Sequence, residues 1–185
     1  MRSAVTVAAA AAVLALASGL TPLTAAPVAL ADQTTAVGPP ADPGDGSLPN
    51  GGTLSPFDVG DPAIGRLDPQ LRSAIQDAAT AARADGVTMT ITSGWRSAEF
   101  QQRLLDDAVH TYGSLAVARE YVETPEHSKH VIGEAVDVGG TGADQWLIAH
   151  GARFGLCQIY ANELWHFELA TDAAGACPPL RPNAA

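Results

Sequence analysis

The segment "EHSKHVIGEAVDVGG", residues 126–140, constrains the fold most, because a glycine interrupts a run of branched apolar residues. Valine and isoleucine favour strands over helices, whereas glycine weakens both. On one straight strand, the seven-residue separation of His130 and Asp137 would put their side chains on opposite faces. We therefore predict a bend or bulge near Gly133 that turns His130 toward Asp137.

A second segment, "NELWHFEL", alternates as a β-strand with one apolar face does. On such a strand His166 and Glu168 point away from the aromatic residues. In "AVDV", Asp137 likewise points away from two valines. If the two strands are neighbours, Asp137 and His166 converge, and the predicted bend adds His130. We expect Trp165 to belong to the apolar core.

Two imidazoles and a carboxylate form a ligand set typical of catalytic zinc, which keeps its fourth position for water. The metal lowers the pKa of that water toward about 7. The reaction then needs a carboxylate that accepts a proton and passes it to the leaving amine. Glu163 precedes His166 by three residues, where a turn can bring it over the metal. We therefore predict one Zn²⁺ per chain on His130, Asp137 and His166, with Glu163 as the general base.

The remaining patterns predict helices followed by paired strands. Asp68 and Pro69 are typical of a helix start, and Gly86 of its end. The other expected elements are a strand over 87–92, helices over 97–110 and 114–121, a helix opening at Thr141 and Asp144 in capping-box spacing, and strands in "LCQIYA" and "LWHFEL". This order indicates a single α+β domain, with helices packed on an antiparallel sheet.

Residues 1–31 have the pattern of a secretory signal peptide, with Arg2, an apolar run over 4–20, and a small-residue cleavage site at Ala29 and Ala31. The alternative is a membrane anchor, but the run is shorter than the roughly 20 apolar residues that a span needs. We therefore expect a secreted protein with no membrane span after cleavage.

Beyond the signal peptide we expect three parts. Residues 32–56 are rich in Pro, Gly, Asp, Ser and Thr and lack an apolar period, which predicts a disordered linker. Residues 57–180 are predicted to form the domain, and residues 181–185 a C-terminal tail. We expect a monomer.

The charge balance excludes two classes of partner. The net charge is −10, and it becomes −11 when residues 1–31, which hold one arginine and no acid, are removed. Nucleic acid needs clustered cations, and anionic membrane surfaces attract polybasic segments. Because Lys129 is the single lysine, we expect neither partner.

The two cysteines, Cys157 and Cys177, are predicted to form a disulfide. An even pair in an exported protein is typical of one. A zinc thiolate pair is the alternative, but no CxxC spacing supports it.

Three motifs in chain order resemble those of the VanY-type D-alanyl-D-alanine carboxypeptidases, zinc peptidases of the bacterial cell wall. "SKHVIGEAVD" matches S-x-H-x-x-G-x-A-x-D, "ELWH" is similar to E-x-W-H, and "SGWRSAEFQ" is similar to S-G-Y-R-S-x-x-x-Q. The resemblance implies the zinc ligands and base named above. It also implies that Arg96, Gln101 and Ser128 bind the terminal D-alanine or the reacting carbonyl, and a guanidinium suits a carboxylate.

The sequence departs from the family's pattern at three places. Leu164 stands where proline is common, "TPEHSKH" replaces a frequent Pro-Gly, and Glu168 stands where a basic residue is frequent. These changes affect the turn at Glu163, the pocket charge and substrate choice. They leave the ligand set intact. His127 is a rival ligand, but we expect it in an exposed loop.

The resemblance implies a secreted, cell-wall-associated bacterial carboxypeptidase that removes the terminal D-alanine of peptidoglycan stem peptides. The alternatives are an L,D-carboxypeptidase or an endopeptidase of the same fold, or a non-catalytic, zinc-stabilised binding module. Glu163 favours an enzyme, because a structural metal site needs no base.

Overall fold

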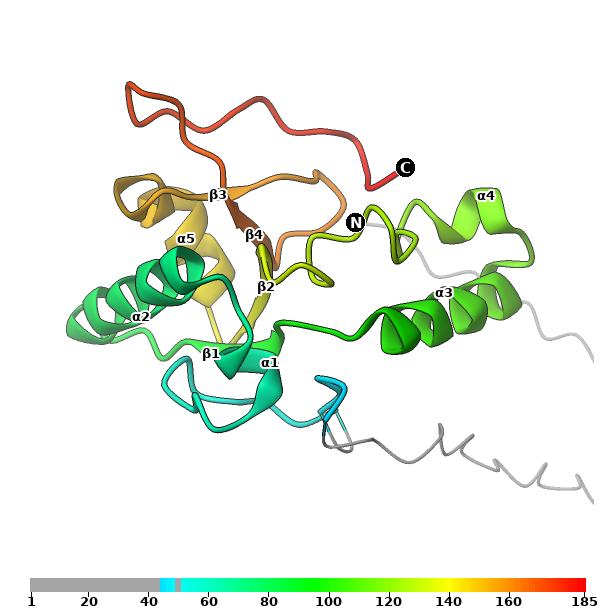
Figure 1. The fold of residues 1–185 in the computed structure, drawn as a ribbon. Coiled ribbons are helices and arrows are strands. Elements are labelled where there is room, and N and C mark those ends of the chain that lie inside the picture. Colours follow the sequence, from blue (N-terminus) through cyan, green and yellow to red (C-terminus); the bar gives the residue numbers. More distant parts are fainter. Residues whose placement is uncertain (1–43, 49–50) are drawn as a thin grey trace, which may run out of the picture. The chain divides into compact units, whose positions relative to one another are not determined.

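The computed structural model describes residues 44–48 and 51–185 (Figure 1). The predicted signal peptide and most of the predicted linker lie outside the described residues. Among the described helices, none has the length and apolar character needed to span a bilayer.

Four strands form one antiparallel sheet, β1 (Thr90–Ser93), β2 (Ala135–Gly139), β3 (Leu156–Gln158) and β4 (His166–Leu169), in the order β1-β2-β4-β3. Each pair of neighbours runs antiparallel. In this register Asp137 lies opposite His166 on β4 and opposite Ser93 on β1. The predicted convergence of Asp137 and His166 required β2 and β4 to be neighbours, and this pairing is confirmed.

Helices lie on both sides of this sheet (Figure 1). On one side lie α2 (Pro69–Ala84), α5 (Ala143–His150) and the 3₁₀ helix η2 (Gly151–Phe154). On the other lie α3 (Ala98–Tyr112) and α4 (Leu115–Ala118). The short helix α1 (Pro62–Gly65) lies near the end of β1, where the Trp95 amide donates to the Ala63 carbonyl at 2.8 Å. The main core joins the first group to the sheet, and its fully buried large side chains are Ile64, Leu71, Ile75, Ile91, Val136, Leu147, Leu156 and Phe167. The α+β fold with an antiparallel sheet is confirmed.

The predicted helix starts are confirmed for α2, α3 and α4, whose N-cap is Ser114, and wrong for a fourth helix. The Asp68 carboxylate accepts from the amides of Gln70 and Leu71 at the start of α2, and the Ser97 hydroxyl accepts from the amide of Phe100 at the start of α3. The capping box at Thr141 and Asp144 is absent. Instead Gly142 is the N-cap of α5. Its backbone is left-handed (φ 78°), and no side chain caps the helix with a hydrogen bond.

Gly133 bends the chain as predicted, and the strand β2 begins only after it. Residues 129–133 form a turn, with the Gly133 amide donating to the His130 carbonyl at 3.1 Å. Gly133 has φ 77°, and a Cβ there would lie 2.6 Å from the Arg66 carbonyl oxygen, so only glycine fits. His130 therefore comes from a turn and Asp137 from a strand. Because the two residues do not share one straight strand, their seven-residue separation does not put their side chains on opposite faces.

The domain's contacts extend past both of its predicted boundaries. On the N-terminal side, Asp45 is buried and forms an ion pair with Arg103, and Leu54 exchanges backbone hydrogen bonds with Ile91 at 2.8 and 2.9 Å. On the C-terminal side, the Arg181 amide donates to the Ile159 carbonyl at 2.9 Å. The described parts of the predicted linker and tail thus pack on the domain.

A disulfide joins Cys157 on β3 to Cys177, with their Cα atoms 5.6 Å apart, as predicted. It closes a loop over 20 positions of sequence that contains β4. The bond therefore ties the C-terminal segment to the strand next to β4.

We expect the Cys157→Ser/Cys177→Ser double variant to lose roughly 3 kcal/mol of unfolding free energy, because an open loop of this length gives the unfolded chain more entropy. Urea unfolding of both proteins, followed by circular dichroism, measures the difference. Equal unfolding midpoints and slopes would contradict this expectation, as would two free thiols in the denatured, unreduced parent.

Candidate metal centre

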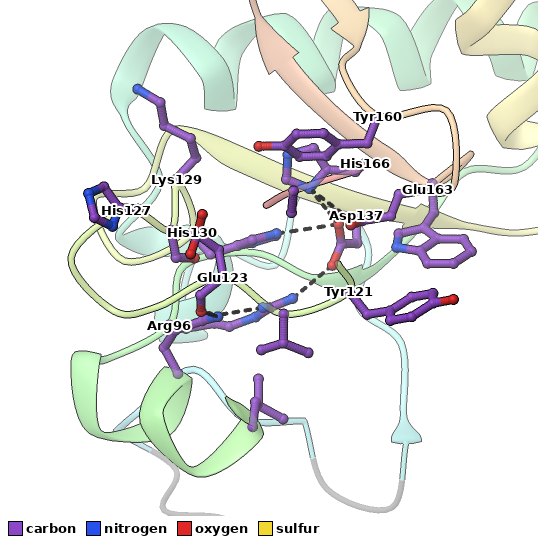
Figure 2. A pocket seen from close by; sticks show the side chains of 16 residues that line it. Arg96, Tyr121, Glu123, His127, Lys129, His130, Asp137, Tyr160, Glu163 and His166 are labelled. Atoms are coloured by element: carbon purple, nitrogen blue, oxygen red, sulfur yellow. Dashed lines mark hydrogen bonds and ion pairs between the residues drawn. The ribbon is translucent and has the colours of Figure 1, made fainter. Parts of the chain in front are cut away.

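Three buried side chains from distant parts of the chain converge at one point (Figure 2). His130 Nε2 lies 3.3 Å from Asp137 Oδ1, and His166 Nδ1 lies 3.2 Å from the same oxygen. The candidate ligand atoms of these residues all lie within 4.8 Å of one another. The structure therefore brings together the three residues that the sequence selected, in a cluster that can hold a metal ion.

The second nitrogen of each histidine has its own partner. His130 Nδ1 lies 2.7 Å from the Gly94 carbonyl oxygen, and His166 Nε2 lies 2.9 Å from Glu168 Oε1. Both partners are acceptors, so these nitrogens donate to them. His130 Nε2 and His166 Nδ1 face Asp137 Oδ1, and a metal ion bound at the cluster would take their lone pairs. Metal-binding histidines are commonly oriented in this way.

The cluster shifts the pKa of each member. Burial alone would raise the pKa of Asp137, but His130, His166 and Arg96 hold it well below its usual range. Burial disfavours a charged His166, yet its hydrogen bonds to Asp137 and Glu168 raise its pKa to about 9. Burial and the nearby Arg96 lower the pKa of His130. A metal must displace a proton from His166 at neutral pH, because ligands bind in their deprotonated forms.

Arg96 fixes Asp137 from the side away from the histidines. Its Nη2 donates to Asp137 Oδ2 at 2.8 Å, its Nη1 to Gln101 Oε1 at 3.0 Å, and its Nε to Ser93 Oγ at 2.7 Å. Asp137 Oδ1 is thereby left facing the two rings. The guanidinium lines the pocket, and each of its three nitrogens is hydrogen-bonded to a protein group, one of them to the carboxylate.

Gln101 and Ser128, the other two predicted substrate-binding residues, line the same pocket. Gln101 is buried: its oxygen accepts from Arg96 and its nitrogen donates to the Glu123 carbonyl at 2.8 Å. These contacts make Gln101 a support for Arg96. Ser128 is also buried, in the turn that leads to His130.

Glu163 lies in the turn before β4, and its Oε2 is 3.8 Å from His166 Nδ1. Its other oxygen, Oε1, is buried and has no hydrogen-bond partner among the residues that the structure describes. Burial raises the pKa of Glu163 to about 7. A carboxyl group with this pKa can accept and release a proton near neutral pH.

The cluster opens into a cavity of about 230 Å³ that also includes residues without a sequence signal. Tyr160 lies with its ring centroid 5.0 Å from that of His166, and Tyr121, Lys129 and Ala184 line the cavity too. No motif or spacing marks these four residues, because they reach the site through the folding of loops.

Two expectations about neighbouring residues have opposite outcomes. Trp165 is 45% exposed and lines the cavity, so its assignment to the core is wrong. The reason is that β4 begins at His166, and Trp165 belongs to the preceding turn, where strand alternation does not apply. His127 is exposed and lies outside the three-residue cluster, as expected.

A small α+β domain with two histidines, one aspartate and a buried glutamate around one cavity has the make-up of a metal-dependent hydrolase. The family model of VanY, D-alanyl-D-alanine carboxypeptidase, matches residues 65–170, more than half of the chain. The chain belongs to this family.

A curated relative is also similar to part of the chain. A D-alanyl-D-alanine carboxypeptidase of Enterococcus faecalis is 32% identical over 127 residues, which cover 55% of this chain and 47% of the relative. This chain thus spans about half the length of that relative.

Two solved structures share the fold at 31% identity and a TM-score of 0.52, each covering 55% of this chain. One is a variant of the D,D-pentapeptidase VanY from a VanB-type resistance cassette in complex with Zn(II), matched over 71% of its chain. The other is VanYB in complex with D-alanine-D-alanine, matched over 70% of its chain.

We expect one divalent metal ion per chain, and we expect His130→Ala, Asp137→Ala and His166→Ala each to abolish its binding at stoichiometric metal. Loss of a residue that only supports a ligand lowers metal affinity by roughly 10- to 100-fold. Loss of a ligand itself should lower the metal affinity by more than this. Elemental analysis of protein dialysed against zinc measures the content. His127→Ala is the control and should keep full occupancy. Full zinc in the three ligand variants would contradict the assignment.

Proposed function

We propose that this chain is a zinc-dependent carboxypeptidase that removes the terminal D-alanine from peptidoglycan stem peptides. The observation that carries the proposal is the buried cluster of His130, Asp137 and His166, with the Glu163 carboxylate 3.8 Å from His166. Family membership and the VanYB complex with D-alanine-D-alanine support the substrate class. Two imidazoles and a carboxylate suit zinc. When bound, zinc would supply a Lewis acid and lower the pKa of water.

In this proposal Glu163 carries the proton. Its buried Oε1 has no protein partner among the described residues and its pKa is about 7, so it can take a proton from the attacking water. The same group can then give that proton to the departing amine of D-alanine. A metal site that only stabilised the fold would have no use for such a carboxyl group. This contrast favours an enzyme over a zinc-stabilised binding module.

Arg96 has two proposed roles. It holds Asp137 through Nη2, and it presents unused N–H groups to the substrate, because each Nη carries two N–H groups and the contacts to Asp137 and Gln101 use one on each. A carbonyl or carboxylate oxygen of the substrate can accept from the remaining pair. Ser128, in the turn beside His130, adds a hydroxyl group to the same cavity.

The cellular site proposed for this activity is outside the cytoplasm, at the bacterial cell wall. The disulfide between Cys157 and Cys177 supports this, because such bonds persist in oxidising compartments. The predicted signal peptide over residues 1–31 is consistent with export.

The proposed function is tested by incubating the zinc-loaded protein with two synthetic peptides, one ending in D-Ala-D-Ala and one ending in a single D-alanine after an L-residue. Mass spectrometry of the products identifies the bond that is cut. Release of D-alanine from the first peptide alone supports the proposal. Release from the second alone would make the chain an L,D-carboxypeptidase. If neither peptide is cut, the chain is not an enzyme for these bonds, and the remaining alternative is the zinc-stabilised binding module.

We expect Glu163→Gln to lower kcat by at least about 100-fold while zinc content stays unchanged, because the amide keeps the size of the side chain but cannot accept the proton. Steady-state kinetics on the D-Ala-D-Ala peptide, with elemental analysis of the same samples, give both quantities.

The matched control for this variant is Glu134→Gln, which removes an exposed carboxylate paired with Lys129. Its kcat should remain near that of the parent. Near-parental turnover by Glu163→Gln would remove Glu163 from the role of base.

We expect Arg96→Lys to lower kcat/KM by about 10- to 100-fold, the effect of losing a hydrogen bond to a charged group. Lysine keeps the charge but cannot contact Ser93, Gln101 and Asp137 at once. Zinc content should stay unchanged.

Arg103→Lys is the control, since Arg103 also pairs with an aspartate, Asp45, but does not line the cavity. Kinetics with the free-acid peptide and its C-terminal amide should separate the two roles of Arg96. If the parent cuts the amide as well as the acid, Arg96 does not recognise the terminal carboxylate.

A further inference from the structure

Glu168 is a nearly buried carboxylate that the proposed reaction does not use. It lies two residues after His166 on the same face of β4, and 13% of its side chain is exposed. Its Oε1 lies 2.9 Å from His166 Nε2, the ring nitrogen turned away from the cluster. Glu168 is therefore in contact with a candidate ligand without being one.

The position of Glu168 separates it from the substrate. It does not line the cavity that contains the cluster; it lines a second cavity of about 240 Å³, together with Asp68, Gln70, Lys129 and Glu134. Among the described residues, the contact of Glu168 with the cluster is its hydrogen bond to the His166 ring.

His166 has a carboxylate oxygen at each ring nitrogen, Glu168 Oε1 2.9 Å from Nε2 and Asp137 Oδ1 3.2 Å from Nδ1. Nδ1 is the nitrogen that faces the cluster, so a metal ion bound there would take its lone pair. The ring then keeps one N–H, at Nε2, which donates to Glu168. His130 has the opposite arrangement, because its Nδ1 is held by the Gly94 carbonyl. One candidate ligand is thus supported by the backbone and the other by a charged side chain.

We propose that Glu168 is a positioning residue that orients His166 for metal binding and strengthens it as a ligand. A carboxylate that accepts from a ligating imidazole fixes the ring and raises its basicity. This inference rests on the metal assignment of the proposed function, and it adds a residue that touches neither substrate nor metal.

The first test compares zinc affinity among Glu168→Ala, Glu168→Gln and the parent, by competition with a chromogenic chelator at one fixed pH. Glu168→Ala should raise the zinc dissociation constant by about 10- to 100-fold, the usual effect of losing such a partner. Glu168→Gln keeps an oxygen that accepts from Nε2, so its affinity should lie between those of the parent and Glu168→Ala.

Glu134→Gln is the matched control here as well, because it removes a negative charge from the same second cavity without contact with His166. Its zinc affinity should equal that of the parent. Equal weakening in Glu134→Gln and Glu168→Ala would show a general charge effect and would overturn the proposal.

The second test reads the hydrogen bond itself, by proton NMR of the zinc-loaded proteins. The parent should show a downfield imidazole N–H resonance from His166 Nε2, assigned in protein with ¹⁵N-labelled histidine, and this resonance should be shifted or lost in Glu168→Ala. When assays are saturated with zinc, KM should stay the same, because Glu168 lies outside the substrate cavity.

The outcomes separate this proposal from the proposed function. If Glu168→Ala and Glu168→Gln bind zinc as tightly as the parent, the role of Glu168 is wrong, while the ligand assignment stands. If the parent binds no zinc, both fall. If Glu168→Ala does not fold, the affinity and the N–H resonance of Glu168→Gln decide: values unchanged from the parent in both would overturn the proposal.

Discussion

The carboxylate of Asp137 is the group on which the rest of the site depends. Arg96 holds one of its oxygens at 2.8 Å, and the other lies 3.2 Å from His166 and 3.3 Å from His130. A buried carboxylate is costly unless it is paired and hydrogen-bonded. Here the cation and the two rings supply those partners, and they lower the pKa of Asp137. The same arrangement leaves one oxygen oriented toward the centre of the cluster.

The fold delivers the partners of Asp137 by pairing strands that are distant in sequence. Its strand β2 lies between β1 and β4, so Ser93 and His166 are its neighbours on either side. The turn at Gly133 adds His130 from the same stretch of chain. Gly94 is needed as well: a Cβ there would lie 2.0 Å from the Ala63 carbonyl oxygen, and the carbonyl of Gly94 itself holds His130. Two glycines thus allow the close backbone approaches that position one imidazole.

Segments outside the family match also contribute to the structure around the site. The family match ends at residue 170, yet Ala184 is buried and lines the cavity, and the disulfide at Cys177 ties this segment to β3. On the N-terminal side, Asp45 accepts from the Ser47 amide at 2.9 Å and pairs with Arg103 on α3. The composition of residues 32–56 predicted a disordered linker, and the cysteine pair predicted the attachment of the C-terminal segment. Composition does not reveal the contacts of Asp45 and Ala184.

The sequence by itself determined the fold class, the helix starts at Asp68 and Ser97, the bend at Gly133 and the three residues of the cluster. The helix starts and the bend are local, because a capping side chain and a glycine act within a few residues. The cluster residues were selected by strand periods and motifs, but their convergence also needed the pairing of β2 with β4. Only the tertiary structure decided that Trp165 lines the cavity, that Gln101 supports Arg96, and that Glu168 holds His166. Such contacts depend on where each strand starts and on which distant segments meet. Trp165 lies in the turn one residue before β4, where strand alternation does not set the direction of a side chain, and no local pattern marks where the strand begins.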